Sequence, residues 1–259
     1  MTTAPLEGET ILVTGGGSSV GRAIAERCLA AGAKVHICDV NGDAVQATLK
    51  DTPGLHGTSG SVGSPDDVDH IIDQATEWMG PLSALVNVVG IGGPKAAIED
   101  ISLNDWRESM TINLDGMFHC IRKVVPTMKA QRKGAIINFS SGSTRTGLPL
   151  RTPYVVSKYA VEGLTKNLAR ELGPHNIRVN AILPGMIENE RMKGILERNA
   201  AEEGVSVEEI KARYLQYISM RSGISPDELA EMTAFLIGPG GRHVTGQLIG
   251  VCGNVEWEI

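Results

Sequence analysis

Short apolar runs alternate with longer segments of helical periodicity along this chain. The apolar runs, each about as long as one strand, cover residues 11–13, 34–38, 55–61, 84–89, 135–137, 177–183 and 248–251. Helical patterns follow most of them, at 22–31, 65–79, 104–128, 152–172 and 225–236. Such alternation is typical of an α/β fold with parallel strands. We therefore predict a single doubly wound (Rossmann) domain over residues 1–259, with a seven-stranded parallel sheet.

Three of the helical segments have recognisable signals. Segment 65–79 places four apolar residues on one helical face: Val68, Ile71, Ile72 and Ala75. The segment 225–228, Ser-Pro-Asp-Glu, has the composition of a capped helix start. Thr152 is a suitable N-cap, and Pro153 follows it where a missing N–H costs little. We therefore predict that this helix begins after Thr152 and ends at residues 173–174, Gly-Pro.

Composition restricts the possible partners. With 259 residues, of which 42% are hydrophobic, the chain is long enough for one well-buried domain. Its net charge of −6 and the lack of a basic run of five residues argue against a nucleic-acid partner. The four cysteines form no C-x-x-C pair and no apolar run reaches 18 residues, so we expect free thiols, no membrane partner and a cytoplasmic location. The six histidines form no cluster spaced for metal binding, and we expect no metal.

A glycine-rich turn follows the first apolar run. Residues 14–21 read Thr-Gly-Gly-Gly-Ser-Ser-Val-Gly, and a helical pattern begins directly after them. Strand, glycine turn and helix in this order present unpaired backbone N–H groups to a pyrophosphate. The candidate cofactor-binding residues of this turn are Gly15, Ser18, Ser19, Val20 and Gly21. The alternative is a flexible glycine turn without a ligand.

An aspartate ends the second apolar run, 18 residues after the last glycine of the turn. This residue, Asp39, can accept hydrogen bonds from both ribose hydroxyls of NAD and would repel the 2′-phosphate of NADP. The next residue is Val40, so no arginine stands there to receive that phosphate. We therefore expect NAD as the cofactor, with Asp39 and Val40 beside its adenosine ribose. The alternative is a solvated aspartate in a turn.

Tyr154 and Lys158 lie four residues apart on one predicted helix and therefore share a face. The neighbouring ammonium and the helix dipole both favour the phenolate, so we expect a lowered pKa for Tyr154 and a role as general acid and base. Ser141 precedes Tyr154 by 13 residues, at the end of the preceding strand, from where its hydroxyl can reach the same substrate oxygen. By itself, the Tyr-x-x-x-Lys pattern is also compatible with a chance surface pair.

The combination of Ser141, Tyr154 and Lys158 resembles the catalytic centre of the short-chain dehydrogenase/reductase family. The resemblance implies hydride transfer between nicotinamide and an alcohol or carbonyl carbon, with Tyr154 moving the proton and Ser141 binding the alkoxide. Lys158 would then also hold the nicotinamide ribose. The family's Tyr-x-x-x-Lys helix helps to build an interface between subunits, so the resemblance also implies a homo-oligomer, either a tetramer or a dimer.

The chain departs from the family's patterns at several positions, two of which are Ser19 and Asn189. The glycine pattern T-G-x-x-x-G-x-G is matched by Thr14, Gly15 and Gly21, whereas Ser19 replaces its middle glycine. The Cβ of Ser19 is expected to crowd the cofactor, or its hydroxyl to donate to a phosphate oxygen. The later pattern P-G-x-V/I-x-T has Asn189 in place of its threonine, which keeps a hydrogen-bonding group but changes its reach.

Further matches extend the resemblance over nearly the whole chain. Asn87 and Gly90 correspond to the family's N-N-A-G, in which the asparagine braces the central sheet. Asn113 corresponds to a family asparagine that kinks a helix and holds a water between the catalytic lysine and bulk solvent. Without the resemblance, Asn113 is equally compatible with an ordinary polar residue in a helix.

The resemblance also assigns the adenine and nicotinamide contacts. Ser61 and Val62 stand where the family has Asp-Val/Leu beside the adenine, so a hydroxyl replaces the usual carboxylate. Pro184, Gly185 and Ile187 match the pattern P-G-x-V/I-x-T, in which the backbone of the V/I position binds the nicotinamide carboxamide. We expect all five residues to contact the cofactor.

The substrate is less strongly indicated by the sequence. Residues 188–218 are polar and helical with little continuous apolar face, which predicts a mobile lid over the substrate. Aromatic residues make up only 4% of the chain, and Lys95, Arg145 and Arg151 lie on loops near the expected mouth. We expect a small polar substrate such as a polyol, a sugar derivative or a hydroxy acid. Each of these arginines is also compatible with an ordinary solvated surface charge.

Three functions are compatible with these residues. An NAD-dependent alcohol or sugar dehydrogenase is favoured, because Ser141, Tyr154 and Lys158 are all present and Asp39 favours NAD. A 3-oxoacyl-thioester reductase of the same fold would share these residues and more often use NADPH. A scaffold that binds NAD without turnover belongs to a different class of protein, and only Ser19 favours it.

Overall fold

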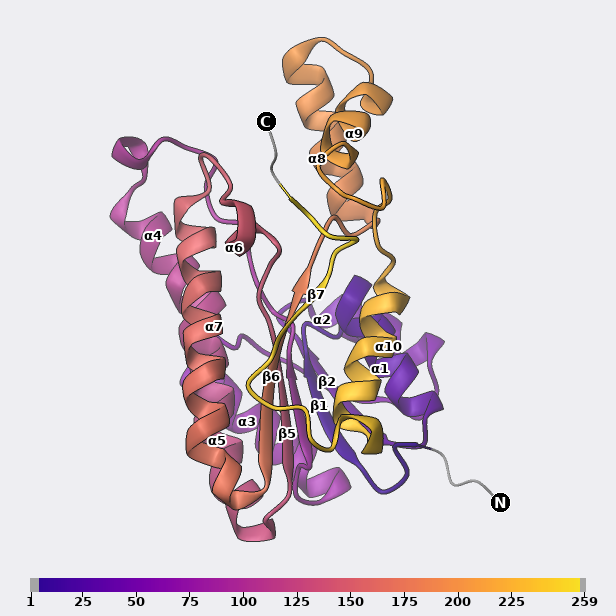
Figure 1. The fold of residues 1–259 in the computed structure, drawn as a ribbon. Coiled ribbons are helices and arrows are strands. Elements are labelled where there is room, and N and C mark those ends of the chain that lie inside the picture. Colours follow the sequence, from indigo (N-terminus) through magenta and orange to yellow (C-terminus); the bar gives the residue numbers. More distant parts are fainter. Residues whose placement is uncertain (1–4, 257–259) are drawn as a thin grey trace.

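The apolar runs form one parallel sheet in the computed structural model, which describes residues 5–256 (Figure 1). Its strands are β1 (Thr10–Thr14), β2 (Lys34–Asp39), β3 (His56–Ser59), β4 (Ala84–Asn87), β5 (Gly134–Phe139), β6 (Ile177–Pro184) and β7 (Leu248–Val251). They are ordered β3-β2-β1-β4-β5-β6-β7, and every neighbouring pair is parallel. The predicted doubly wound sheet of seven parallel strands is therefore confirmed.

Helices cover both faces of the sheet. They are α1 (Ser19–Ala30), α2 (Gly42–Asp51), α3 (Pro65–Met79), α4 (Leu103–Met110), α5 (Gly116–Gln131), α6 (Ser143–Thr146), α7 (Thr152–Leu172), α8 (Glu190–Glu203), α9 (Val207–Leu215) and α10 (Pro226–Ile237). Side chains alternate along a strand, so Ile11 and Val13 join a core with α1 and α10, whereas Leu12 joins a core with α3, α5 and α7. None of the helices described here is long and apolar enough to cross a bilayer.

The predicted helix signals are confirmed in two of three cases. In α10, Ser225 Oγ accepts from the backbone N–H of Glu228 at 3.3 Å, and the Glu228 carboxylate accepts from that of Ser225 at 2.7 Å. Helix α3 has the predicted bounds and buries its four apolar positions. The expected N-cap at Thr152 is wrong, since Thr152 is already helical. The N–H of Val155 donates to the carbonyl oxygen of Arg151, so α7 begins one residue earlier than predicted.

The segment predicted as one helix at 104–128 is divided. Helix α4 and helix α5 are joined by a π-helical turn, Thr111–Asp115, which contains Asn113. The third strand is also shorter than expected, because the N–H of Ser61 donates to the side chain of Asp67 at 2.8 Å rather than continuing the sheet. The sequence analysis did not predict α2 or the short helix α6.

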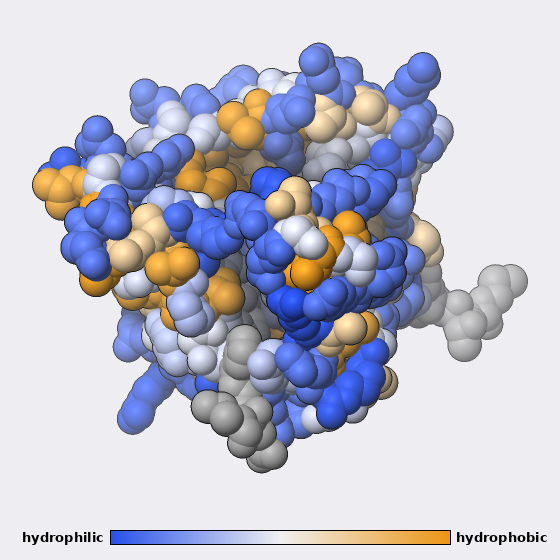
Figure 2. Space-filling view, turned by 90° about the horizontal axis from the view of Figure 1, so that it is seen from above, coloured by the Kyte–Doolittle hydropathy of each residue, from blue (hydrophilic) through white to orange (hydrophobic). Residues whose placement is uncertain are grey.

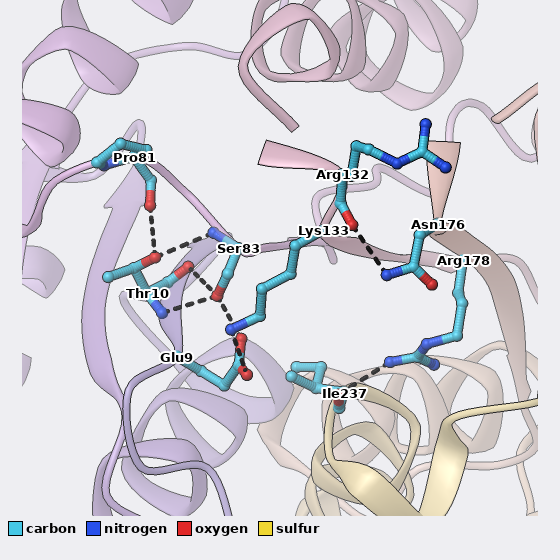
Figure 3. A network of polar contacts seen from close by, with 9 residues as sticks. All are labelled: Glu9, Thr10, Pro81, Ser83, Arg132, Lys133, Asn176, Arg178 and Ile237. Atoms are coloured by element: carbon cyan, nitrogen blue, oxygen red, sulfur yellow. Dashed lines mark hydrogen bonds and ion pairs between the residues drawn. The ribbon is translucent and has the colours of Figure 1, made fainter. Parts of the chain in front are cut away.

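Polar contacts fasten the amino ends of the strands (Figure 3). Ser83, just before β4, donates to the Glu9 carboxylate, which also pairs with Lys133 before β5 at 2.8 Å. Further along this edge, Arg178 of β6 donates to the carbonyl oxygen of Ile237 at the end of α10, at 2.9 Å. These contacts join elements that come from distant parts of the chain.

The opposite edge, at the carboxyl ends of the strands, lies below α8 and α9 (Figure 1). Strands β1 and β4 are neighbours there although two strands separate them in the sequence, and such a switch in strand order opens a crevice. Helices α8 and α9 share a small core of Leu196, Ala200 and Ile210, so segment 188–218 has more apolar contact than the sequence analysis expected. Figure 2 looks down on this end, where orange apolar groups lie among a largely hydrophilic surface.

Candidate active site

The glycine turn after β1 forms a tight loop at the start of α1. Gly15 has a φ of 70°, which glycine adopts without strain. A Cβ on Gly21 would lie 2.0 Å from the carbonyl oxygen of Gly15, so only glycine fits at this crossing. Ser18 precedes α1 without making a side-chain cap bond, so its hydroxyl does not compete for the first N–H groups of the helix. This cradle fits a pyrophosphate, with Ser18 and Ser19 exposed and Val20 buried beneath them.

Two of the departures from the family's patterns, Ser19 and Asn189, contact each other. Ser19 has a left-handed backbone, with a φ of 46°, and its Oγ accepts a hydrogen bond from Asn189 Nδ2 at 2.8 Å. Asn189 is the N-cap of α8, and its Oδ1 accepts from the N–H of Met192 at 2.9 Å. The serine hydroxyl therefore binds the start of α8, an arrangement that neither expectation for Ser19 included.

Asp39 lies where the sequence analysis placed it, at the end of β2 and beside the glycine turn. Its Oδ2 accepts from the N–H of Gly17 at 3.2 Å, and its Oδ1 accepts from that of Asn41 at 3.0 Å. The carboxylate is held by two backbone donors and is not paired with any arginine or lysine among residues 5–256. Val40 is 76% exposed, and Asp39 is half-buried.

Ser61 and Val62 lie in the turn between β3 and α3. Ser61 Oγ accepts from the N–H of Gly63 at 3.2 Å, so the hydroxyl that replaces the family's carboxylate takes part in the turn. Val62 is buried, and a Cβ on Gly116 would lie 2.7 Å from its side chain. Val62 therefore packs against the start of α5.

Asn87 and Gly90 shape the end of β4. Asn87 Nδ2 donates to Asn138 Oδ1 of β5 at 3.0 Å, so Asn87 braces the sheet as the family resemblance implied. A Cβ on Gly90 would lie only 3.0 Å from Lys158 Nζ. Glycine at position 90 therefore allows the loop after β4 to approach the lysine.

Lys158 and Tyr154 lie together on α7. The Lys158 ammonium is 5.8 Å from the centre of the Tyr154 ring, and the lysine side chain is almost fully buried. Its Nζ donates to the carbonyl oxygen of Phe139 at 2.8 Å, which uses one of the three hydrogen bonds that an ammonium can donate. Burial lowers the pKa of Lys158 to about 8, and the positive charge of Arg191 also lowers this pKa.

Asn113 is fully buried in the π-helical turn. Its Oδ1 accepts from the N–H of Ile91 at 2.7 Å, and its Nδ2 donates to the Ile91 carbonyl and to Ser157 Oγ, each at 3.0 Å. Asn113 therefore joins the loop after β4 to α7, beside Lys158. Its role in a proton relay stays a prediction.

Ser141 lies at the end of β5, at the wall of a cavity of about 430 Å³. The neighbouring Gly142 N–H donates to the carbonyl oxygen of Pro184 at 2.8 Å, which places Ser141 beside the end of β6. Mostly apolar side chains from α8, α9 and nearby loops line the cavity, among them Leu148, Met186, Met192, Ile210, Tyr214 and Ile218. The cavity reaches Ser141, Pro184 and Gly185, whereas Tyr154 lies outside its lining.

The segment after β6 is held from both sides. The N–H of Gly185 donates to the carbonyl oxygen of Val251 at 2.9 Å, and a Cβ on Gly185 would lie 2.7 Å from the Cα of Cys252. Ile187 forms a bridge with Ile224, in which the hydrogen bonds are made by the residues on either side of Ile187. The backbone is therefore well fixed where the family binds the nicotinamide carboxamide.

Comparisons with known proteins agree with this geometry. A family model described as enoyl-(acyl carrier protein) reductase matches residues 15–254, nearly the whole chain. The chain belongs to the short-chain dehydrogenase/reductase family. It is accordingly an oxidoreductase that acts on CH–OH groups, interconverting secondary alcohols and ketones.

Several members of the family are similar over their whole length. The chain is 32% identical to 2,5-dichloro-2,5-cyclohexadiene-1,4-diol dehydrogenase of Sphingobium indicum, covering 96% of this chain and 97% of the relative. It is 33% identical to 3-oxoacyl-[acyl-carrier-protein] reductase FabG of Thermotoga maritima, covering 96% and 98%.

Solved structures with either nicotinamide cofactor are similar to this short-chain dehydrogenase/reductase. An actinorhodin polyketide ketoreductase variant with NADPH has a TM-score of 0.90 at 32% identity, covering 95% of this chain and 96% of the other. A 7α-hydroxysteroid dehydrogenase complexed with NADH and 7-oxo glycochenodeoxycholic acid has a TM-score of 0.89 at 29% identity, covering 99% and 97%. The family therefore does not by itself decide between NAD and NADP.

The cations expected near the mouth of the site lie in three different settings. Lys95 pairs with Glu202 of α8 at 2.9 Å, and Arg145 is exposed at a separate hollow beside the end of β7. Arg151 does lie near Tyr154, and Arg191 of α8 joins it there, which the sequence analysis missed. No motif marks Arg191, because its position depends on how α8 folds back over the sheet.

Proposed function

We propose that this enzyme transfers a hydride between NAD(H) and a secondary alcohol or ketone, with Tyr154 as the general acid and base. The observation that carries the proposal is the buried Lys158 ammonium, 5.8 Å from the Tyr154 ring and beside the loop that follows β4. Ser141 lies at the wall of the adjoining cavity. These residues lie at the carboxyl ends of the strands, where doubly wound sheets bind their ligands.

Each residue has a distinct part in the proposed mechanism. The nicotinamide, when bound, would supply the hydride chemistry. Tyr154 would give a proton to the carbonyl oxygen, or take one from the carbinol, while Ser141 donates a hydrogen bond to the same oxygen. Lys158 would use its remaining N–H groups for a ribose hydroxyl and for Tyr154. Asn113 would fix the loop after β4. It would thereby help to position a water that relays protons between Lys158 and bulk solvent.

The proposed cofactor is NAD, and the position of Asp39 supports it. Its carboxylate lies beside the glycine turn and would accept hydrogen bonds from the adenosine ribose. A 2′-phosphate at that place would meet a negative charge and, at Val40, no cation. The cradle made by Gly15 and Gly21, with Ser18 and Ser19 at the helix start, would hold the pyrophosphate.

The remaining cofactor contacts follow the family resemblance. Ser61 and Val62 would lie beside the adenine, and Asn87 and Gly90 would support the nicotinamide side. Pro184, Gly185 and Ile187 would hold the carboxamide, for which the fixed backbone after β6 is favourable.

Helices α8 and α9 are the proposed lid over the substrate. They cover the cavity beyond Ser141, and the ion pair between Lys95 and Glu202 links α8 to the loop on the opposite side. The apolar lining favours a substrate with an apolar part, more than the wholly polar substrate expected from composition. Lids of this kind exclude water from the reacting groups.

The proposal includes a homo-oligomer. On the outer faces of α5 and α7, Phe118 is 47% exposed, Val156 40% and Tyr159 53%. Apolar side chains that gather on one face of a soluble domain mark a contact surface. A dimer or tetramer built on these helices would cover them.

Replacing Tyr154 by phenylalanine tests the mechanism. Tyr154→Phe should lower kcat by about 100- to 10,000-fold, because it removes the proton donor, while NADH still binds. The assay follows NADH absorbance with a panel of secondary alcohols and ketones, and NADH binding is measured by fluorescence titration. Tyr159→Phe, the same substitution on the exposed side of α7, is the matched control. Because the Tyr159 hydroxyl donates to the carbonyl oxygen of Thr144, this control also measures the effect of losing a tyrosine hydrogen bond outside the reacting groups.

Two outcomes would contradict the proposal. Unchanged turnover in Tyr154→Phe would show that another group moves the proton. NADH binding by the wild-type protein without turnover of any alcohol or ketone in the panel would favour a scaffold that binds NAD without catalysis.

A 3-oxoacyl-thioester reductase is the second candidate. It is favoured by the 33% identity to the 3-oxoacyl-[acyl-carrier-protein] reductase and by the apolar cavity, which suits an acyl chain. Activity with 3-oxoacyl thioesters and NADPH, exceeding that with free ketones and NADH, would support this candidate over the first.

A further inference from the structure

Two arginines from different elements meet at the loop that borders the candidate active site. Arg151, directly before α7, donates through Nη1 to the carbonyl oxygens of Gly93 at 2.7 Å and Gly92 at 3.4 Å. Arg191, the second residue of α8, donates to the carbonyl oxygen of Gly90 at 3.5 Å. A Cβ on Gly92 would lie 2.9 Å from Arg191 Nη2 and 3.6 Å from Arg151 Nη1. Both guanidinium groups therefore lie against the same glycine.

This pair of arginines has no counter-charge. Across residues 5–256, neither guanidinium is within ion-pair distance of a carboxylate. Two other cations at the lid are paired, Lys95 of the facing loop with Glu202 and Arg213 of α9 with Glu203. Burial lowers the pKa of Arg151, and the charges of Arg191 and Arg198 lower this pKa further. Arg151 is half-buried, whereas Arg191 is exposed. A half-buried guanidinium without a counter-charge, facing a second guanidinium, is costly unless a ligand neutralises it.

The cluster also lies close to the proposed reacting groups. The Arg151 guanidinium interacts electrostatically with Tyr154 and with Tyr214, which lines the cavity. The Arg191 charge reaches Lys158, which is itself buried beside Gly90. An anion held by the two arginines would therefore lie beside the same loop, residues 90–93, that contacts Lys158.

We propose that Arg151 and Arg191 form an anion-binding subsite for the substrate, which would then be a secondary alcohol or ketone bearing a carboxylate, sulfonate or phosphate group. The proposal rests on the proposed function and specifies its substrate class. A guanidinium is planar and offers paired N–H donors that match the oxygens of such groups. Because one arginine lies directly before α7 and the other on α8, the bound anion would also join the lid to the start of α7.

The same chemistry is present in the cofactor, whose pyrophosphate is the other possible anion. The first turn of α8 adjoins the glycine turn through the bond between Asn189 and Ser19, so Arg191 is not far from that region. The experiment therefore needs separate arms for the substrate anion and the cofactor phosphate.

Binding is measured by calorimetry with the full-length protein saturated with NAD. The probes are three anionic ketones, acetoacetate, 2-oxopropane-1-sulfonate and dihydroxyacetone phosphate, and two neutral counterparts, methyl acetoacetate and dihydroxyacetone. The variants are Arg151→Ala and Arg191→Ala. Lys193→Ala is the control. Lys193 lies on α8 like Arg191 and its side chain is 62% exposed, and the substitution removes one positive charge, as each arginine substitution does.

At least one anionic ketone should bind the wild-type protein about 10-fold more tightly than its neutral counterpart. Each arginine substitution should lower the affinity for that anionic ketone by about 10- to 100-fold, which corresponds to the loss of hydrogen bonds to a charged group. The affinities of both arginine variants for the neutral ketones and for NADH should stay within about 2-fold of the wild-type values. Lys193→Ala should bind all of these ligands, the anionic ketones included, within about 2-fold of the wild-type affinity. Added salt should lower the affinity for the anionic ketone and leave the affinity for its neutral counterpart unchanged.

Three results would overturn the subsite. The first is that no anionic ketone binds more tightly than its neutral counterpart. The second is an equal loss for anionic and neutral ketones in the arginine variants, which would indicate a structural role. The third is a loss of NADH affinity without a loss for the anion, which would assign the arginines to the cofactor phosphate. Failure of the proposed function would give a different result: the anionic ketones would bind, but no NADH would form from NAD and hydroxy acids.

Discussion

The hydrogen bond between Ser19 and Asn189 should couple the glycine turn to the lid, and a double-mutant cycle can measure this coupling. The two residues are 170 positions apart, and their side chains meet at 2.8 Å. Ser19→Ala removes the acceptor and keeps the Cβ, so the cost of the left-handed backbone at φ 46° is unchanged. Asn189→Ala removes the donor and also the N-cap of α8.

The magnitudes follow from these contacts. An exposed hydrogen bond contributes about 0.5 to 1 kcal/mol to the free energy of unfolding, which is the expected cost of Ser19→Ala. Loss of the cap to the N–H of Met192 adds about 1 kcal/mol, so Asn189→Ala should cost about 1.5 to 2 kcal/mol. The double variant should cost no more than Asn189→Ala alone, which gives a coupling energy of about 0.5 to 1 kcal/mol.

Urea unfolding at one fixed protein concentration supplies the four free energies of the cycle. Ser18→Ala paired with Asn189→Ala is the control cycle, because Ser18 makes no side-chain cap bond at α1, and its coupling should be close to zero. A coupling below about 0.3 kcal/mol between Ser19 and Asn189 lies within the error of additivity. That result would refute the argument that this bond holds α8 to the glycine turn.

Two further predictions concern Lys158 and Asp39. Burial lowers the pKa of Lys158 from 10.5 to about 8 in the folded protein. Between pH 8 and pH 10.5 the unfolded chain therefore binds a proton at Lys158 more strongly than the folded protein does. The free energy of unfolding should consequently rise with pH over this interval. Relative to Lys158→Met, the unfolding free energy should therefore rise by about 3 kcal/mol from pH 8 to pH 10.5 in urea titrations, and parallel pH profiles would contradict this. Asp39→Asn should raise the affinity for NADPH relative to NADH by about 10-fold, because it removes the charge facing the 2′-phosphate. Fluorescence titration measures both affinities, with Asp66→Asn on the exposed start of α3 as the control, and an unchanged ratio would show that Asp39 does not select the cofactor.

Local features of the sequence were sufficient to predict the sheet and most of helix α7. Apolar runs of strand length, separated by helical periods, have few arrangements other than a parallel sheet with helices on both faces. The four-residue spacing of Tyr154 and Lys158 places both on one face of a helix wherever that helix packs. The capping box of α10 is likewise complete within four residues, 225–228. Each of these features depends only on the backbone geometry of a single element.

The tertiary structure alone decided which distant side chains meet. The start of α7 depends on the carbonyl of Arg151, so the local capping signal at Thr152 was misleading. Asn113 finds its partners in the loop after β4 and in α7, and Ser19 finds Asn189 on α8. Arg191 reaches the loop at Gly92 only because α8 folds back over the carboxyl ends of the strands. Such contacts join residues from separate elements, and they are set by how the helices pack rather than by any spacing along the chain.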